Sequence, residues 1–103
     1  MTITEIATQY LHGQKLCREA FELSNEILAK KFARGRITIG KITAGIPCNV
    51  PDKEQKQIRD CVAERDRLKS RAAELTMARL CYLHKVSHHT VMAEIDRMRG
   101  IAA

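Results

Sequence analysis

A cysteine and three histidines near the end of the chain have side chains that could hold a metal ion. Cys81, His84, His88 and His89 are of the two residue types that zinc prefers as ligands. However, a helix break must fall between His84 and His88, and neighbouring residues such as His88 and His89 point in different directions from a helix. We therefore expect surface histidines here, with neither a metal site nor a bound cofactor.

Catalytic arrangements are also missing from the sequence. No nucleophile stands at a suggestive spacing from a base, and the stretch GRITIGKIT (35–43) lacks the glycine spacing and the strand–helix context of a phosphate-binding Walker loop. Aromatic residues make up only 4% of the chain, so a substrate pocket would be hard to enclose. We therefore do not expect an enzyme.

The same histidines follow a serine that is suited to begin a helix. The hydroxyl of Ser87 can accept hydrogen bonds from amides of the next turn, and Val86 can anchor the preceding turn against the core. The apolar residues that follow at steps of four and three, and would face inward, are Val91, Ile95 and Met98. The residues left to face outward are His88, His89, Met92 and Asp96. This pattern predicts one helix over 75–84, a tight turn, and a second helix over 87–98.

The segment VSHHTVMAEIDRM (86–98) resembles the recognition helix of LuxR-type and related helix-turn-helix regulators. In that family a turn hydrophobe, a serine, two variable residues, a Thr-Val pair and spaced apolar residues recur. The resemblance covers about 20 of the 103 residues and implies a DNA-binding helix-turn-helix over 75–99. The residues that it implies contact phosphates or base edges are Ser87, His88, His89, Thr90 and Met92. His84 and Lys85 depart from the family, which usually has Leu and a turn Gly there, and a merely well-capped helix is the alternative.

The charge of the chain favours a polyanionic partner. The formal net charge is +6 and the pI is near 9.4, and no acidic residue occurs over 27–51 or over 75–93. The cations that we expect to contact phosphates are Lys30, Lys31, Arg34, Arg36 and Lys41 in the first stretch, and Lys85, Arg97 and Arg99 around the second. Glu94 and Asp96 count against the DNA interpretation, because carboxylates are disfavoured near phosphate.

Apolar spacing predicts two long helices. The first runs over 3–34, begins at a Thr2–Glu5 capping box, and ends at Gly35 as a C-terminal cap. The second starts near residue 53, and its inward face is formed by Ile58, Cys61, Val62, Leu68, Ala72 and Leu75. Between them, 36–46 fits a short strand and a short helix equally well, and Pro47 and Pro51 end that element.

An internal similarity bears on this ambiguous segment. Residues 28–46 laid over 77–95, at a constant offset of 49, match at several positions, among them Ile37 with Val86 and Ile42 with Val91. A duplication would place a second related unit in the N-terminal half and would make 36–46 a helix. Chance similarity between two amphipathic segments is the alternative.

Composition predicts the fold class. The chain has the length of a single domain (1–103), few aromatics and many helix-forming residues, which favours an all-α protein: a small helical bundle with a C-terminal helix-turn-helix. The four cysteines show no CxxC spacing and no apolar leader is evident, so we expect a cytoplasmic protein with reduced thiols, Cys17 and Cys61 being buried. No apolar run approaches the roughly 20 residues that span a bilayer.

The sequence thus predicts a small DNA-binding protein that regulates transcription. One short recognition helix gives limited specificity, so we expect a homodimer on double-stranded DNA, with one of the long helices as its interface. The alternative is a small basic helical interaction protein, an inhibitor or adaptor, that binds an acidic protein partner with the same cationic faces.

Overall fold

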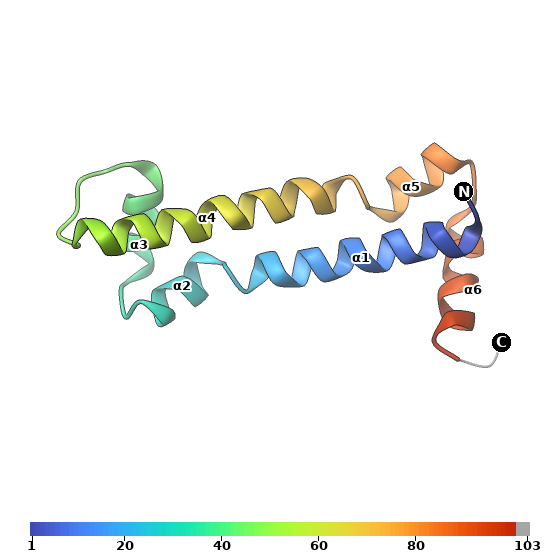
Figure 1. Ribbon diagram of the computed structural model, residues 1–103, viewed down its shortest axis with the longest axis horizontal. Coiled ribbons are helices and arrows are strands. Elements are labelled where there is room, and N and C mark those ends of the chain that lie inside the picture. Colours follow the sequence, from blue (N-terminus) through green and yellow to red (C-terminus); the bar gives the residue numbers. More distant parts are fainter. Residues whose placement is uncertain (101–103) are drawn as a thin grey trace. The chain divides into compact units, whose positions relative to one another are not determined.

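The computed structural model describes residues 1–100, and these form six α-helices and no strand (Figure 1). The helices are α1 (Ile3–Phe21), α2 (Asn25–Lys31), α3 (Arg36–Ala44), α4 (Asp52–Ala73), α5 (Met77–His84) and α6 (His88–Met98). The predicted all-α class is confirmed, and the ambiguous segment 36–46 is the helix α3 with its C-cap. None of these helices is both long enough and apolar enough to traverse a lipid bilayer.

The predicted first helix over 3–34 is wrong, because the chain breaks between α1 and α2. Ser24 caps α2 by accepting a hydrogen bond from the Ile27 backbone N at 3.3 Å. The predicted C-terminal cap at Gly35 is also wrong: the left-handed residue after α2 is Ala33 (φ 54°), whereas Gly35 (φ −74°) is the N-cap of α3. The apolar spacing continues through Ser24, so periodicity did not reveal the break.

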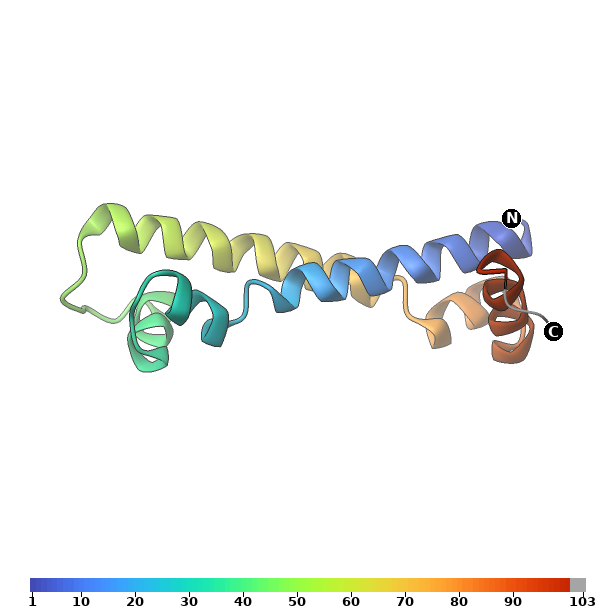
Figure 2. The same cartoon turned by 90° about the horizontal axis from the view of Figure 1, so that it is seen from below.

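The described chain divides into two compact units. The central unit, residues 18–69, contains α2, α3 and most of α4, and the terminal unit contains residues 1–17 with those from 70 onward. Within the central unit, α2 and α3 lie beside the first turns of α4, and within the terminal unit, α5 and α6 lie near the start of α1 (Figures 1 and 2). Each unit therefore combines a pair of short helices with part of a long helix, and in the terminal unit that helix, α1, comes from the other end of the chain.

The core of the central unit is aliphatic. Its buried residues are Leu28, Ala29, Ile39, Ile42, Val50, Ile58 and Val62. Two arginines tie α4 to the short helices: Arg34 Nη2 donates to Glu54 Oε2 at 2.6 Å, and Arg65 Nη1 donates to Asn25 Oδ1 at 2.7 Å. The side chain of Arg65 is only 13% exposed. Polar contacts therefore hold α4 to the start of α2 and to the turn that follows it.

The core of the terminal unit is also aliphatic. Its buried apolar residues are Ile6, Ala7, Leu16, Ala72, Leu75, Leu80, Val91 and Ile95. Gly13 permits a close approach inside this unit, because a Cβ there would lie 2.7 Å from Leu75 Cβ and 3.0 Å from the Leu75 carbonyl oxygen. Cys17 was predicted to be buried, and this is wrong: it lies on an exposed side of α1, whereas Cys61 is partly buried.

The two pairs of short helices repeat the same local construction. The corresponding residues are the N-caps Ser24 and Thr76, the left-handed residues Ala33 and Lys85, and the N-caps Gly35 and Ser87, each pair separated by 52 residues. Buried residues follow the same step, as in Leu28 with Leu80 and Ile39 with Val91. The predicted offset of 49 is therefore wrong by three residues. A shift of three residues is nearly one helical turn, so it preserves most of an amphipathic pattern.

Candidate nucleic-acid interface

The segment between α5 and α6 is a tight turn of three residues, 85–87. Lys85 has φ 53° and ψ 44°, and its backbone N–H donates to the Cys81 carbonyl oxygen, as does that of Val86 at 3.2 Å. A left-handed conformation favours glycine, but a lysine adopts it here. The unusual Lys85 therefore does not prevent a sharp turn between the two helices.

Ser87 begins α6, as predicted. Its Oγ accepts from the Thr90 backbone N at 3.1 Å and lies 2.7 Å from the Thr90 hydroxyl. Both residues are exposed, and so are His88 and His89 between them. The two hydroxyls thus fix the first turn of the helix, while the two imidazoles are presented to solvent.

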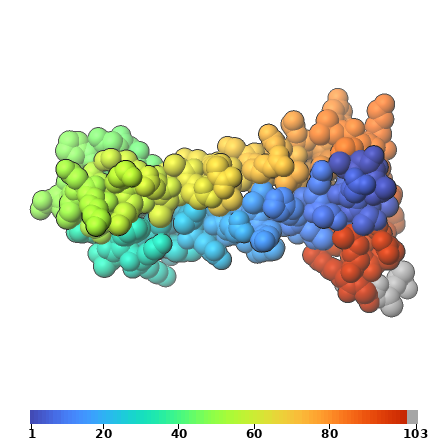
Figure 3. All heavy atoms as spheres, viewed as in Figure 1, coloured from blue at the N-terminus to red at the C-terminus, as the bar shows by residue number. Residues whose placement is uncertain are grey.

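The inner face of α6 is anchored in the terminal unit. Val91 is fully buried and Ile95 is 1% exposed, as the apolar spacing predicted. Met98, predicted to continue this stripe, is 38% exposed, because α6 ends at this residue, one turn beyond the buried positions. Met92 and Asp96, predicted to face outward, are partly buried. In the space-filling view α6 (red) lies at the surface beside the start of α1 (blue; Figure 3).

Glu94 is turned toward α1 and is 8% exposed. It accepts a hydrogen bond from the Thr4 hydroxyl and pairs with Arg97, whose Nη2 lies 3.0 Å from Glu94 Oε2. The Arg97 and Thr4 hydrogen bonds lower the pKa of Glu94 from 4.5 to about 2. Glu94 therefore has its own internal partners, and it takes up part of the charge of Arg97, which was predicted to contact phosphate.

The ion pair at Glu94 predicts an acid-sensitive terminal unit. Because the folded-state pKa of about 2 lies below the ordinary value of 4.5, the stabilisation is complete above about pH 4.5 and is lost as the pH falls toward 2. Melting temperatures between pH 7 and pH 2 should fall more steeply for the unmodified chain than for Glu94→Gln. A gap between the two that stays constant over this range would show that Glu94 has no such role.

The cations of the central unit that were predicted to contact phosphate differ in whether they form ion pairs within the protein. Arg34 is committed to Glu54, and this hydrogen bond raises the pKa of Arg34. The exposed residues that form no ion pair within the described part of the chain are Lys30, Lys31, Arg36 and Lys41, the ammonium of Lys31 lying 5.7 Å from the ring centroid of Phe32. Lys85 and Arg99 are likewise exposed and unpaired in the terminal unit.

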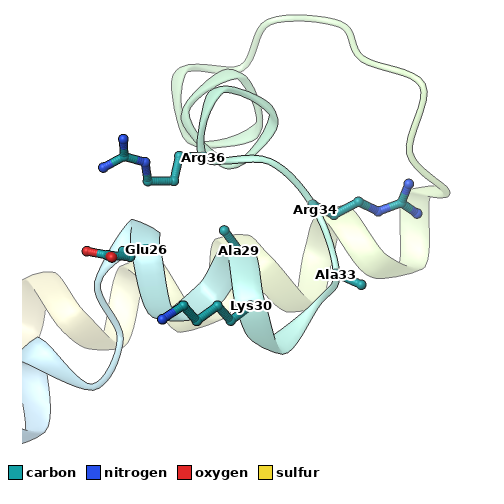
Figure 4. Close-up of a pocket in the computed structure, with 6 residues that line it drawn as sticks. All are labelled: Glu26, Ala29, Lys30, Ala33, Arg34 and Arg36. Atoms are coloured by element: carbon teal, nitrogen blue, oxygen red, sulfur yellow. The ribbon is translucent and has the colours of Figure 1, made fainter.

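A surface hollow of about 510 Å³ lies between α2 and the start of α3 (Figure 4). Its lining residues are Glu26, Ala29, Lys30, Ala33, Arg34 and Arg36. Lys30 and Arg36 extend toward the side on which Glu26 lies, whereas Arg34 points away from them. Over residues 1–100, no three His, Cys, Asp or Glu side chains gather as a metal site would require. The hollow thus offers cationic groups with one carboxylate beside them.

Three of the exposed apolar side chains lie on α3 and α5, and they were not identified from the sequence. Ile37 is 79% exposed on α3, and Tyr82 and Leu83 are 84% and 55% exposed on α5. Both helices lie in the stretches that lack acidic residues, and this was the feature of the sequence that could have pointed to them. Exposed apolar groups beside cations are suited to contact a partner that is not uniformly charged.

Comparisons with protein-family models, with curated proteins and with solved structures find no match for this chain. The candidate interface is therefore defined by the chain's own geometry and charge. In the terminal unit it consists of the Ser87-capped start of α6, with Lys85 and Arg99 at either end of the helix.

Proposed function

We propose that the chain is a small DNA-binding protein, a transcriptional regulator, that inserts the first turn of α6 into the major groove of duplex DNA. The observation that carries this proposal is the pairing of a firmly anchored inner face, Val91 and Ile95, with an exposed first turn bearing His88 and His89. A helix enters the major groove in this way when its leading residues reach base edges.

Charge and hydrogen-bonding capacity support the same proposal. Lys85 and Arg99 are exposed cations in the terminal unit and are suited to phosphate oxygens. Each neutral imidazole offers one donor and one acceptor to base edges. Of the two carboxylates that counted against DNA in the sequence, Glu94 is engaged with Thr4 and Arg97, and Asp96 is partly buried.

A homodimer belongs to this proposal. A single short recognition helix reads few base pairs, whereas a twofold dimer doubles the contacts and recognises two half-sites. A size measurement on the chain with and without duplex DNA distinguishes a dimer from a monomer.

Binding to duplex DNA tests the proposal directly. A mixed-sequence duplex should bind with a Kd of about 10⁻⁴ to 10⁻⁶ M at moderate salt, more weakly as salt increases. Selection from a random duplex pool should then enrich a preferred site, and His88→Ala with His89→Ala should reduce that preference by roughly ten-fold. His12→Ala, an exposed histidine on α1, is the matched control and should leave the preference unchanged. Failure of the unmodified chain to bind duplex DNA at low salt would exclude the proposal.

A second candidate function follows from Tyr82 and Leu83. Two adjacent, strongly exposed apolar side chains on α5, in a stretch without carboxylates, suit a protein partner with an apolar centre and an acidic rim. In that case the chain is an inhibitor or adaptor. Tyr82→Ala would then abolish binding of that partner, while duplex DNA would bind weakly or not at all.

A further inference from the structure

The outward face of α3 has no partner within the central unit. Ile39 and Ile42 are buried on the inner side of this helix. The residues on the opposite side, which we call the α3 outer face, are Arg36, Ile37, Gly40, Lys41 and Ala44. Successive members are one or three residues apart, so they form one continuous strip along the helix.

No contact within the described chain requires a glycine at position 40. Glycine is among the least favourable residues in a helix interior, and Gly40 lies in the middle of α3. A Cβ at this position would meet no atom within 4 Å, whereas at Gly13 it would collide with Leu75. Internal packing therefore requires a glycine at residue 13 but not at residue 40. A bare backbone on an outward helix face suits a partner that approaches the helix axis closely.

The charge of this face indicates the chemistry of that partner. Arg36 and Lys41 are exposed and form no ion pair in the described structure, and no acidic residue occurs over 27–51. Glu54, which comes from α4, is occupied by Arg34, and Glu26 lies at the hollow between α2 and α3. A polyanion complements such a face. Ile37, 79% exposed beside Arg36, adds the kind of apolar contact that a thymine methyl group accepts.

The step of 52 residues places this face in correspondence with the candidate interface on α6. Arg36 corresponds to His88, Ile37 to His89, and Gly40 to Met92, each following the same left-handed turn and N-cap. The correspondence extends to the buried side of each helix, where Ile39 of α3 and Val91 of α6 are both fully buried. The two helices thus present their first turns by the same construction.

We infer that the α3 outer face is a second surface for duplex DNA. Gly40 lets the helix backbone come close to the duplex, Arg36 and Lys41 contact phosphates, and Ile37 contacts base edges. One chain then carries two groove-contacting helices, one in each unit. The inference rests on the proposed function, since it assigns α3 the same ligand as α6.

The test uses the full chain and a mixed-sequence duplex several helical turns long. Gly40→Leu introduces a good helix former, so helicity and melting temperature should be equal or higher, while affinity for the duplex should fall by about ten-fold because the added side chain holds the helix away. Ala63→Leu creates the same side chain at an exposed position of α4 and should leave affinity unchanged. Arg36→Ala and Lys41→Ala should each reduce the slope of log affinity against log salt by about 0.9.

The possible failures are distinguishable. If the α3 variants bind the duplex as tightly as the unmodified chain, while the His88 and His89 variants lose site preference, the inference is overturned and the proposed function stands. If the unmodified chain binds no duplex, both are overturned. If Gly40→Leu loses affinity but Ala63→Leu loses as much, general crowding explains the loss and α3 has no specific role.

Discussion

Replacing Gly13 by alanine is expected to destabilise the terminal unit by about 1–3 kcal/mol. The new Cβ would lie 2.7 Å from Leu75 Cβ and 3.0 Å from the Leu75 carbonyl oxygen. Neither atom is the free end of a flexible side chain, so the backbone that follows α4 must move away from α1. Urea unfolding of the variant and of the unmodified chain measures the difference.

Gly40→Ala is the matched control for this prediction. The same substitution there places a methyl group in open space on a helix, so the free energy of unfolding should rise by up to about 1 kcal/mol. The two substitutions should therefore have opposite signs. Equal stability of Gly13→Ala and the unmodified chain would show that the close approach to Leu75 is not a feature of the protein.

Ile95→Ala is expected to have the larger effect, a loss of about 2–5 kcal/mol. Ile95 is 1% exposed and, with Val91, fastens α6 to the terminal unit, so its truncation leaves a cavity under the helix. Because the first turn of α6 is then no longer held in place, duplex DNA binding should also weaken. Urea unfolding and the duplex titration measure the two effects.

Met98→Ala provides the comparison on the same helix. Met98 is 38% exposed at the end of α6, so its truncation removes little buried surface and should cost well under 1 kcal/mol. If the two variants had similar stability, α6 would not be anchored through its inner stripe, and the basis for placing its first turn in a groove would be lost.

The sequence predicted the features that depend on neighbours within one or two helical turns. The all-α class, the start of α4, the Ser87 cap and the exposure of His88 and His89 follow from propensity, side-chain capping and apolar spacing. The break at Ser24 is also local, but it was missed. No Glu or Gln follows three residues later to complete a capping box, since Ile27 stands there.

The sequence indicated that the two halves resemble each other, but it did not indicate the correct offset between them. Amphipathic patterns recur almost equally after three or four residues, so an offset of 49 matched apolar positions nearly as well as the actual 52. The N-caps and the left-handed residues Ala33 and Lys85 fix the register, and neither left-handed residue is a glycine that would have marked the turn in the sequence.

The sequence by itself determined that the chain is helical and basic, and that a capped helix starts at Ser87. The tertiary structure decided which charged side chains form ion pairs within the protein and which do not. Thr4 and Glu94 meet although 90 residues separate them, and Arg34 meets Glu54 across 20 residues. A local pattern carries no information about such pairs, because they form only when separate helices pack together. Those contacts engage Glu94 and Arg34, whereas Lys85 before α6 and the two cations of the α3 outer face form no ion pair among residues 1–100.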